Sequence, residues 1–373
     1  MKLLTAAIFL LFSVALVAQK QVHLLVGTYT NGKSKGIYVY DFNTSNASNK
    51  FVSSIKSSNP SFLSVSPNKK FVYAVNENGD SLNNGGAVSA YSFNKKNGRL
   101  QYINQQRSGG NHPCYITTDN NGKWVITANY SGGSFAVMKV QKNGSLTPAK
   151  TIVQHTGKSI NNSRQEKAHV HTTVLTRDNK YLLVADLGLD KVFTYPFDAA
   201  TGAILQKEVK TTSVMGGAGS RHLVIHPSQK FMYLTQELNG TIGAFAMAGD
   251  GTLKLLQTIS AVPEDYIGSF GGADIHVSAD GLFLYASNRG ESNSIAIFSI
   301  DKASGILTSI GYQPTFGSKP RNINFDPSGN FLLVANQDTD NIVIFSINHQ
   351  TGLLTDTGKR ISVPAPVCIQ WIK

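Results

Sequence analysis

The stretch that decides the fold is residues 113–130, which read PCYITTDNNGKWVITANY. It predicts a short strand, a tight polar turn and a second strand that ends in Ala-Asn. The same pattern is written six times along the chain, and a shortened seventh start occurs near the carboxyl end. The copies are residues 60–76, 113–130, 170–186, 220–237, 272–288 and 320–336, with the seventh start at 366–369.

The copies recur with a period near 50 residues. The residue aligned with Cys114 is found at intervals of 53, 57, 50, 52, 48 and 46 residues. Each unit continues with an alternating strand such as 133–140, an Asn-Gly turn at Asn143 and Gly144, and a fourth strand. Four β segments repeated at this period predict a β-propeller.

The two ends of the chain complement each other. Residues 23–29 and 36–42 match second and third strands, so the amino-terminal unit lacks a first strand, whereas 366–371 is a first strand without a second. We therefore predict an all-β fold: a seven-bladed β-propeller of four-stranded antiparallel blades, closed by the C-terminal strand completing the N-terminal blade. Closure would hide the sheet edges that otherwise invite aggregation.

Residues 1–18 differ from the rest of the sequence. Lys2 is followed by an apolar run that ends at Ala18, which is typical of a signal peptide cleaved after Ala18. A membrane anchor is the alternative, although the run is short for a bilayer span. We expect a signal peptide at 1–18, a propeller domain at 19–373, export to the periplasm or the extracellular space, and no membrane span after cleavage.

Composition limits the possible partners. The formal charge of +12 favours anionic ligands or an acidic surface, or simply serves solubility. The lysines are scattered in turns without a nucleic-acid motif, so DNA and RNA are not expected as partners. Cys114 and Cys368 are expected to be buried free thiols. Motifs for nucleotides, zinc proteases and serine hydrolases are absent, and we predict no metal and no cofactor.

Polar residues that depart from the repeat point to a site. In an antiparallel meander, the starts of first strands and the ends of second strands lie at the same sheet edge. These positions should therefore gather on one face of the ring, around the central channel. They include His112, Tyr130, His169, His171, Arg221, His222, Glu237, Asp274, Arg289, Arg321 and Gln337.

The charges at these positions do not balance. Any one of the three arginines alone could form a structural salt bridge, and any one histidine alone could bond to a turn carbonyl. Together, however, three Arg face only two acids, and buried cations are costly unless they are paired. An anionic ligand would complete the balance.

A set of short phrases occurs at the repeat positions: LVGTYT (25–30), HPC (112–114), ANYSGGS (128–134), SRH (220–222), ELN (237–239), SNRG (287–290), PR (320–321) and VANQ (334–337). Together they resemble the seven-bladed propeller lactonase family, which includes propeller-type 6-phosphogluconolactonases and their relatives, the carboxy-muconate cyclases. The resemblance covers residues 22–373 and implies a small-molecule site at the channel mouth, where a lactone ring is opened. It implies functional positions at His169, His171, Arg221, His222, Glu237, Arg289 and Arg321.

We therefore expect an exported hydrolase that opens a sugar lactone, in which export favours unphosphorylated aldonolactones. His171 or Glu237 would act as the general base, and Arg221 and Arg289 would stabilise the oxyanion. The remaining positions would bind substrate: His112, Tyr130, His169, His222, Asp274, Arg321 and Gln337. Two alternatives remain open, a non-catalytic binding module for an anionic sugar and a muconate-type cycloisomerase. The sequence leaves open whether the protein is a monomer or a dimer.

Overall fold

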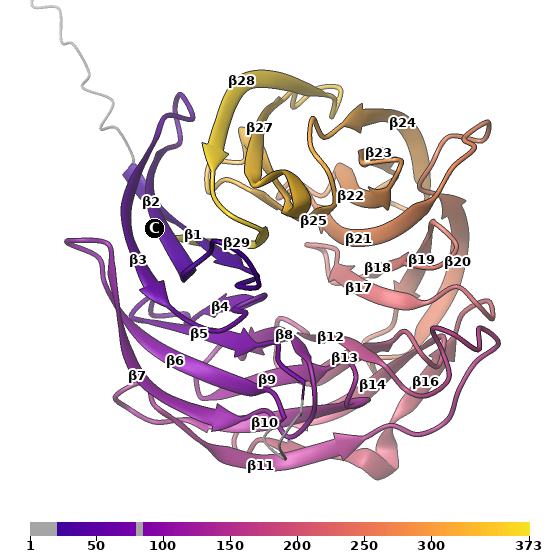
Figure 1. Cartoon of the computed structure of the whole chain (residues 1–373). Coiled ribbons are helices and arrows are strands. Elements are labelled where there is room, and N and C mark those ends of the chain that lie inside the picture. Colours follow the sequence, from indigo (N-terminus) through magenta and orange to yellow (C-terminus); the bar gives the residue numbers. More distant parts are fainter. Residues whose placement is uncertain (1–20, 80–84) are drawn as a thin grey trace, which may run out of the picture.

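The computed structural model describes residues 21–79 and 85–373, so the predicted signal peptide lies outside the described residues. Seven antiparallel sheets form a ring around a central channel (Figure 1). Six sheets have four strands, and in the remaining one the outermost position is divided between two short strands. The predicted seven-bladed, all-β architecture is confirmed.

We number the blades along the chain and give their strands from the channel outwards. Blade 1 contains β29 (Pro366–Ile372), β1 (Gln21–Thr28), β2 (Gly36–Asn43) and β3 (Asn49–Lys56). Blade 2 contains β4 (Leu63–Val65), β5 (Phe71–Asn76), β6 (Ala87–Asn94) and β7 (Arg99–Arg107). Blade 3 contains β8 (Pro113–Thr118), β9 (Trp124–Asn129), β10 (Ser134–Val140) and β11 (Leu146–Gln154).

The remaining blades follow the same plan. Blade 4 contains β12 (Val170–Leu175), β13 (Tyr181–Asp186), β14 (Lys191–Asp198), β15 (Ala203–Ile204) and β16 (Lys210–Ser213), with the 3-10 helix η1 (Gln206–Glu208) between the last two. Blade 5 contains β17 (Ser220–Ile225), β18 (Phe231–Gln236), β19 (Thr241–Met247) and β20 (Leu253–Ser260). Blade 6 contains β21 (Phe270–Val277), β22 (Phe283–Gly290), β23 (Ser294–Ile300) and β24 (Leu307–Pro314). Blade 7 contains β25 (Pro320–Phe325), β26 (Phe331–Asn336), η2 (Gln337–Thr339), β27 (Asn341–Ile347) and β28 (Leu354–Ser362).

The C-terminal strand closes the ring as predicted. β29 pairs antiparallel with β1, so that Ile369 lies opposite Val26 and Trp371 lies opposite Leu24. The last strand of the chain thus lies innermost in the first blade (Figure 1). The inner edge of β1, which would otherwise be unpaired, is covered.

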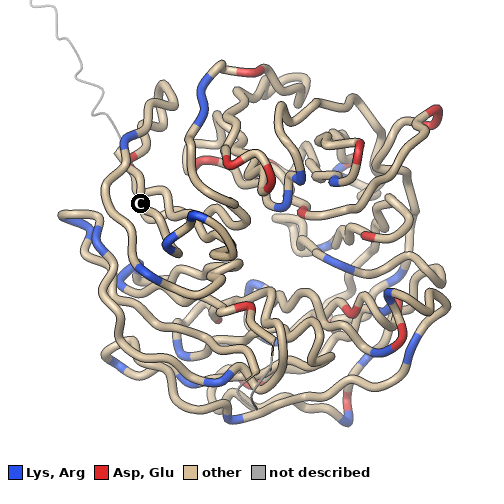
Figure 2. The backbone as a smooth tube through the Cα atoms, in the orientation of Figure 1, with Lys and Arg blue, Asp and Glu red and all other residues tan. Residues whose placement is uncertain are grey.

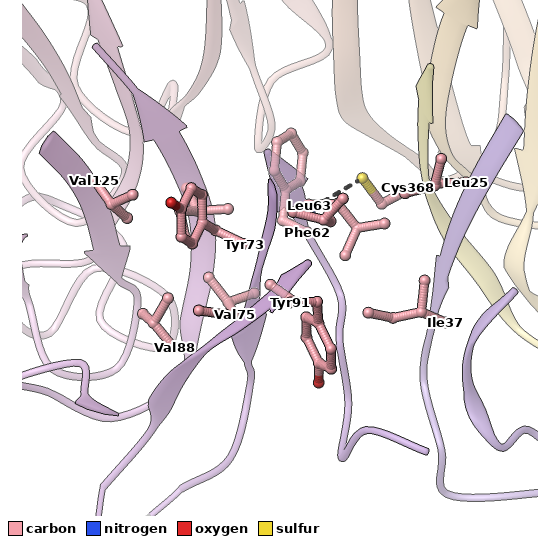
Figure 3. Packing of buried hydrophobic residues seen from close by; sticks show 14 of the residues in the cluster. Leu25, Ile37, Phe62, Leu63, Tyr73, Val75, Val88, Tyr91, Val125 and Cys368 are labelled. Atoms are coloured by element: carbon pink, nitrogen blue, oxygen red, sulfur yellow. Dashed lines mark hydrogen bonds between the residues drawn. The ribbon is translucent and has the colours of Figure 1, made fainter. Parts of the chain in front are cut away.

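Apolar side chains fill the spaces between blades. One cluster joins Leu25 and Ile37 of blade 1 to Tyr73 and Val75 of blade 2 (Figure 3). In the same cluster the backbone N–H of Leu63 donates to Cys368 Sγ at 3.3 Å. Cys114 and Cys368 are both buried and free, as expected.

Each blade from 3 to 7, and blade 1 as well, has a register shift at the start of its innermost strand. Val170 pairs with Asp186 and Thr172 with Ala185, which leaves His171 without a partner residue across the ladder. Equivalent shifts occur at Cys114, at Arg221 and His222, at Ala273 and Asp274, at Arg321 and at Val367. Because a bulge interrupts the alternation of side chains, adjacent residues at these points can both face the channel.

Asparagines at the ends of second strands hold the connections that enter each blade. Asn129 Nδ2 donates to Ser108 O at 3.0 Å, and Asn288 and Asn336 bond in the same way to Ala261 O and Thr315 O. These asparagines therefore have a structural role.

Charged residues are spread around the ring, with Lys and Arg interspersed with Asp and Glu (Figure 2). In the described part of the chain no helix has the length and apolar character needed to cross a membrane.

Candidate functional site

A polar cavity of about 160 Å³ lies at the channel end where the first strands begin. Side chains from six blades or their connections line it. They are Glu77, Cys114, Tyr130, Arg164, His171, Glu237, Arg289 and Arg321.

One buried carboxylate organises three guanidinium groups. Glu237 Oε1 lies 2.6 Å from Arg164 Nη2, and Oε2 lies 2.9 Å from Arg221 Nε and 3.0 Å from Arg289 Nη2. Arg221 is only 1% exposed, and its Nη1 donates to the carbonyl of Ala273. Burial alone would raise the pKa of Glu237, but Arg289, Arg221 and Arg164 outweigh it and hold that pKa well below its usual range. Glu237 is therefore a carboxylate that orients cations.

A second acid–arginine group lies across the cavity. The Tyr29 hydroxyl donates to Glu77 Oε2 at 2.9 Å, and Arg321 Nη2 lies 3.9 Å from Glu77 Oε1. The Arg321 guanidinium also lies over the Tyr29 ring, 5.2 Å from its centroid, in a cation–π contact. These contacts fix Arg321 while leaving part of its donor capacity free for a ligand.

Arg164 reaches the cavity from the connection between β11 and β12. Gln165 in that connection is fully buried and donates to Leu187 O at 2.8 Å, which anchors the segment. The Arg164 side chain is 43% exposed, and it also donates to the Tyr130 hydroxyl at 3.3 Å. Arg164 therefore covers one side of the cavity from outside the repeat.

His171 contributes an uncharged nitrogen base. Its Nδ1 lies 3.6 Å from the Sγ of Cys114, and its ring packs edge-on against Tyr130. Burial and the positive charge of Arg221 hold the pKa of His171 well below its ordinary value, so the imidazole is neutral at pH 7. Burial raises the pKa of the Cys114 thiol, so that thiol stays protonated and is a poor nucleophile.

The cavity carries an excess of positive charge. Arg164, Arg221, Arg289 and Arg321 stand against Glu77 and Glu237, which leaves two positive charges unbalanced. Burial and Arg289 lower the pKa of Arg221 to about 10, so that this guanidinium is still charged at pH 7. Buried cations without full compensation favour a bound anion or a charge that develops during a reaction.

The structure brings six of the predicted residues together. Tyr130, His171, Glu237, Arg289 and Arg321 line the cavity, and Arg221 pairs directly with Glu237. Their roles stay predictions. Among the described residues, no group of three or more His, Cys, Asp or Glu side chains is arranged to hold a metal ion.

Five predicted residues do not line this cavity. His169 stacks on Tyr130 and lies 3.2 Å from Glu166, beside the site. His112 has a positive φ of 51° in the connection before β8, and Gln337 Nε2 donates to Asp338. His222 and Asp274 line a separate cavity further along the channel. The bulges account for His222 and Asp274, because they turn consecutive residues towards different levels of the channel.

The register also corrects the repeat position of Glu237. The sequence pattern alone aligns Glu237 with Asn129 at the strand end, but Gln236 pairs with Ser220 as Asn129 pairs with Pro113. Glu237 therefore occupies the position after the strand, equivalent to Tyr29, Glu77, Tyr130 and Arg289. Glu77 and Tyr29 could have been found from this column of the repeat, whereas Arg164 lies outside the repeat and left no such signal.

Comparison with known proteins agrees with this geometry. The sequence model of the family described as "Lactonase, 7-bladed beta-propeller" matches residues 23–371. A 6-phosphogluconolactonase from Formosa agariphila is 40% identical over 325 residues, which cover 86% of this chain and 91% of that protein. A 6-phosphogluconolactonase from Bacillus subtilis is 35% identical over 349 residues, covering 93% and 97%. The solved structure of a periplasmic gluconolactonase from Pseudomonas aeruginosa has 36% identity and a TM-score of 0.88, covering 95% of this chain and 99% of that one.

Proposed function

Given that this chain belongs to the lactonase family of seven-bladed β-propellers, we propose that it is an exported hydrolase that opens a sugar lactone in the cavity around Glu237. The observation that carries the proposal is the combination of uncompensated guanidinium groups with a neutral buried histidine in one cavity. Hydrolysis of a lactone needs a base that takes a proton from the attacking water. It also needs positive donors that stabilise the carbonyl oxygen as it becomes negative.

The mechanism assigns a role to each group. A water molecule attacks the ring carbonyl while His171 takes its proton, and the guanidinium groups of Arg221 and Arg289 stabilise the oxyanion. Collapse of the tetrahedral intermediate breaks the ring C–O bond, and the imidazolium of His171 returns a proton to the leaving alkoxide. The product is an open-chain hydroxy acid that ionises to its carboxylate.

Glu237 holds the cations rather than acting as the base. A carboxylate paired with three guanidinium groups has little affinity for a proton, so it cannot take one from water. Arg321, which is held by Glu77 and Tyr29, would bind the distal hydroxyls or an anionic group of the substrate.

Two observations support an exported enzyme acting on aldonolactones. Residues 1–18 have the pattern of a cleaved leader, and the relative from Pseudomonas aeruginosa is described as a periplasmic gluconolactonase. An exported enzyme would meet unphosphorylated sugar lactones more readily than phosphorylated ones. We therefore assign δ-gluconolactone as the first substrate to test.

The test measures acid release from δ-gluconolactone and from its 6-phosphate by purified protein, above the spontaneous rate in the same buffer. Arg221→Ala should lower kcat/KM by about 100-fold or more, since it removes an oxyanion donor. Equal rates for wild type and Arg221→Ala would overturn the role assignment. Stabilisation by either lactone in a thermal-shift scan without ring opening would instead favour a binding module.

A further inference from the structure

A larger cavity of about 410 Å³ occupies the channel on the far side of the site described above. It receives one side chain from the same position in every blade, three residues after the residue aligned with Cys114. At the rise of a β-strand this places the ring of lining residues roughly 10 Å further along the channel. The seven are Ser64, Thr117, Val174, Val224, His276, Asn324 and Gln370.

A layer of rings separates the two cavities. Phe62 stacks on Tyr115 with ring centroids 4.2 Å apart, and the His222 ring packs edge-on against Tyr115 at 5.2 Å. On the site side, His222 contacts His171 with ring centroids 5.1 Å apart. Among the described residues the two cavities share no lining residue. The far cavity is therefore a compartment of its own, with an aromatic floor.

One carboxylate orients two histidines of this compartment. His222 Nδ1–H donates to Asp274 Oδ1 at 2.8 Å, and His276 Nε2–H donates to Asp274 Oδ2 at 3.1 Å. Asp274 Oδ2 also accepts from the backbone N–H of Ile323 at 3.1 Å and from Asn322 Nδ2. The carboxylate is thus saturated, and the second nitrogen of each imidazole is left as a hydrogen-bond acceptor.

One of these acceptors lacks a partner. His222 is only 4% exposed, and its Nε2 is buried without any hydrogen bond. Burial and Arg221 lower the pKa of His222 to about 4, so the ring is neutral at pH 7. Because His222 Nε2 has no exposed surface, the acceptor that a ligand hydroxyl can reach is the second nitrogen of His276, whose side chain is 29% exposed.

We propose that the far compartment is a second small-molecule site, which takes a neutral polyhydroxylated ligand of about the size of a monosaccharide. The volume falls within the range of ordinary ligand pockets. Aromatic faces at the floor and imidazole, amide and hydroxyl groups around the wall suit a ring that carries several hydroxyl donors.

The charge of the compartment favours a neutral ligand. Among its described lining residues, Arg177 is the only Lys or Arg and Asp274 is the only acid, so the formal charges offset. The cavity around Glu237, by contrast, has one positive charge in excess among its lining residues, and the buried Arg221 beside it adds a second. The two cavities would therefore select ligands by charge. The cavity around Glu237 would take an anion or a substrate that becomes negative during the reaction, and the far compartment would take an uncharged sugar.

The experiment titrates D-glucose, which is neither a lactone nor an anion, into the purified full chain. Binding is measured by saturation-transfer difference NMR of the glucose signals. Wild type should bind glucose saturably. Val224→Phe, which places a ring in the compartment and narrows it, should weaken binding by about tenfold or more, whereas Val224→Ala at the same position should retain it. His276→Phe should also weaken binding, and His276→Gln, which restores an acceptor, should recover part of it.

Arg289→Gln separates this compartment from the lactonase cavity. Because Arg289 does not line the far compartment, glucose should bind Arg289→Gln as it binds wild type. Loss of binding in Arg289→Gln with full binding in Val224→Phe would place the sugar at the other end and overturn the proposal. Absence of saturable glucose binding by folded wild type would overturn it as well.

Discussion

Arg221 and His222 are neighbours in the chain, yet they serve different compartments of the channel. Arg221 pairs with Glu237 on one side of the ring layer, and His222 bonds to Asp274 on the other. In a regular strand their side chains would point in opposite directions. The bulge at the start of β17 lets both face inwards, so one irregularity brings Arg221 to Glu237 and His222 to Asp274.

At this scale Glu237 is the residue on which the guanidinium groups depend. Glu237→Gln would leave Arg164, Arg221 and Arg289 facing one another without a counter-charge. We expect kcat/KM for δ-gluconolactone to fall by about 100-fold or more and the free energy of unfolding to fall by about 3–5 kcal/mol. Both would be measured on the purified variant, by acid release and by urea unfolding.

Glu264→Gln is the matched control for that substitution, because Glu264 is exposed. It should leave both quantities near the wild-type values. A Glu237→Gln protein as active and as stable as Glu264→Gln would contradict the role given to this carboxylate.

The pH dependence of the reaction tests the proposed role of His171 as the base. Burial and Arg221 lower the pKa of His171, so its imidazole stays neutral well below the ordinary histidine value of about 6.5. We expect kcat/KM to stay level as pH falls from 8 through about 6.5 and to decline only at lower pH. Stopped assays corrected for spontaneous hydrolysis would show this. An acid limb centred at or above about pH 6.5 would mean that another group, or a solvated histidine, is the base.

The site residues that could be predicted from the sequence are those that differ from the other blades at the same repeat position. His171, Arg221 and Arg321 could be found because they share a repeat position at which the other blades carry Ser, Cys, Ala or Val, and Arg289 because it is the only cation at its repeat position. The separation of His222 and Asp274 from them could not, because it depends on bulges that shift one residue without changing the sequence period. Arg164 comes from a connection that no other blade reproduces.

At the scale of elements, the seam between β29 and β1 is the feature that makes the ring continuous. Gly27 of β1 pairs with Cys368 of β29, and a Cβ added at Gly27 would lie 2.3 Å from the carbonyl oxygen of Pro60. Blade 2 therefore packs against the seam at a point where only glycine fits. The sequence predicted this closure because the terminal segments supply complementary parts of one blade.

Gly27→Ala tests the tightness of that seam. The added methyl group must displace backbone rather than a flexible side chain, so we expect the free energy of unfolding to fall by about 1–3 kcal/mol. Urea unfolding monitored by circular dichroism would measure it. Gly32→Ala is the control, since no atom lies within 4 Å of its Cβ position. Equal free energies of unfolding for the two variants would show that the seam has room for a methyl group at residue 27.

Blade 4 shows what element patterns could not predict. Its fourth strand is replaced by β15 and β16, with η1 between them, so the outer edge of the blade is interrupted. The Thr201-Gly202 turn has the same form as in the other blades, and the interruption follows it. A turn can be predicted because it depends on a few neighbouring residues, whereas the course of an outermost strand depends on tertiary packing.

For the whole molecule, the buried titratable groups make the fold less stable as the pH falls. His222 has a pKa of about 4 in the folded protein and about 6.5 when unfolded, so the unfolded chain binds more protons between these values. The free energy of unfolding therefore falls as pH falls through this window. His171 acts in the same sense, and Glu237 and Asp274, whose pKa values are lowered, add further loss at lower pH.

Thermal unfolding between pH 7 and 4 would show this as a falling midpoint. His222→Gln keeps a donor for Asp274 but does not titrate, so its midpoint should fall less steeply than that of wild type. His349→Gln, at an exposed position, should follow the wild-type curve. A His222→Gln curve parallel to wild type would show that His222 is not held neutral by the fold.

Among the described residues the two cavities share no lining residue, and the rings of Phe62, Tyr115 and His222 lie between them. If the cavity around Glu237 opens the lactone, substrate and product occupy the same arginine-lined space. The carboxylate produced by ring opening would then compete with incoming lactone for those arginines. Inhibition by accumulated product should accordingly be competitive, and turnover late in a reaction should slow before the lactone is exhausted.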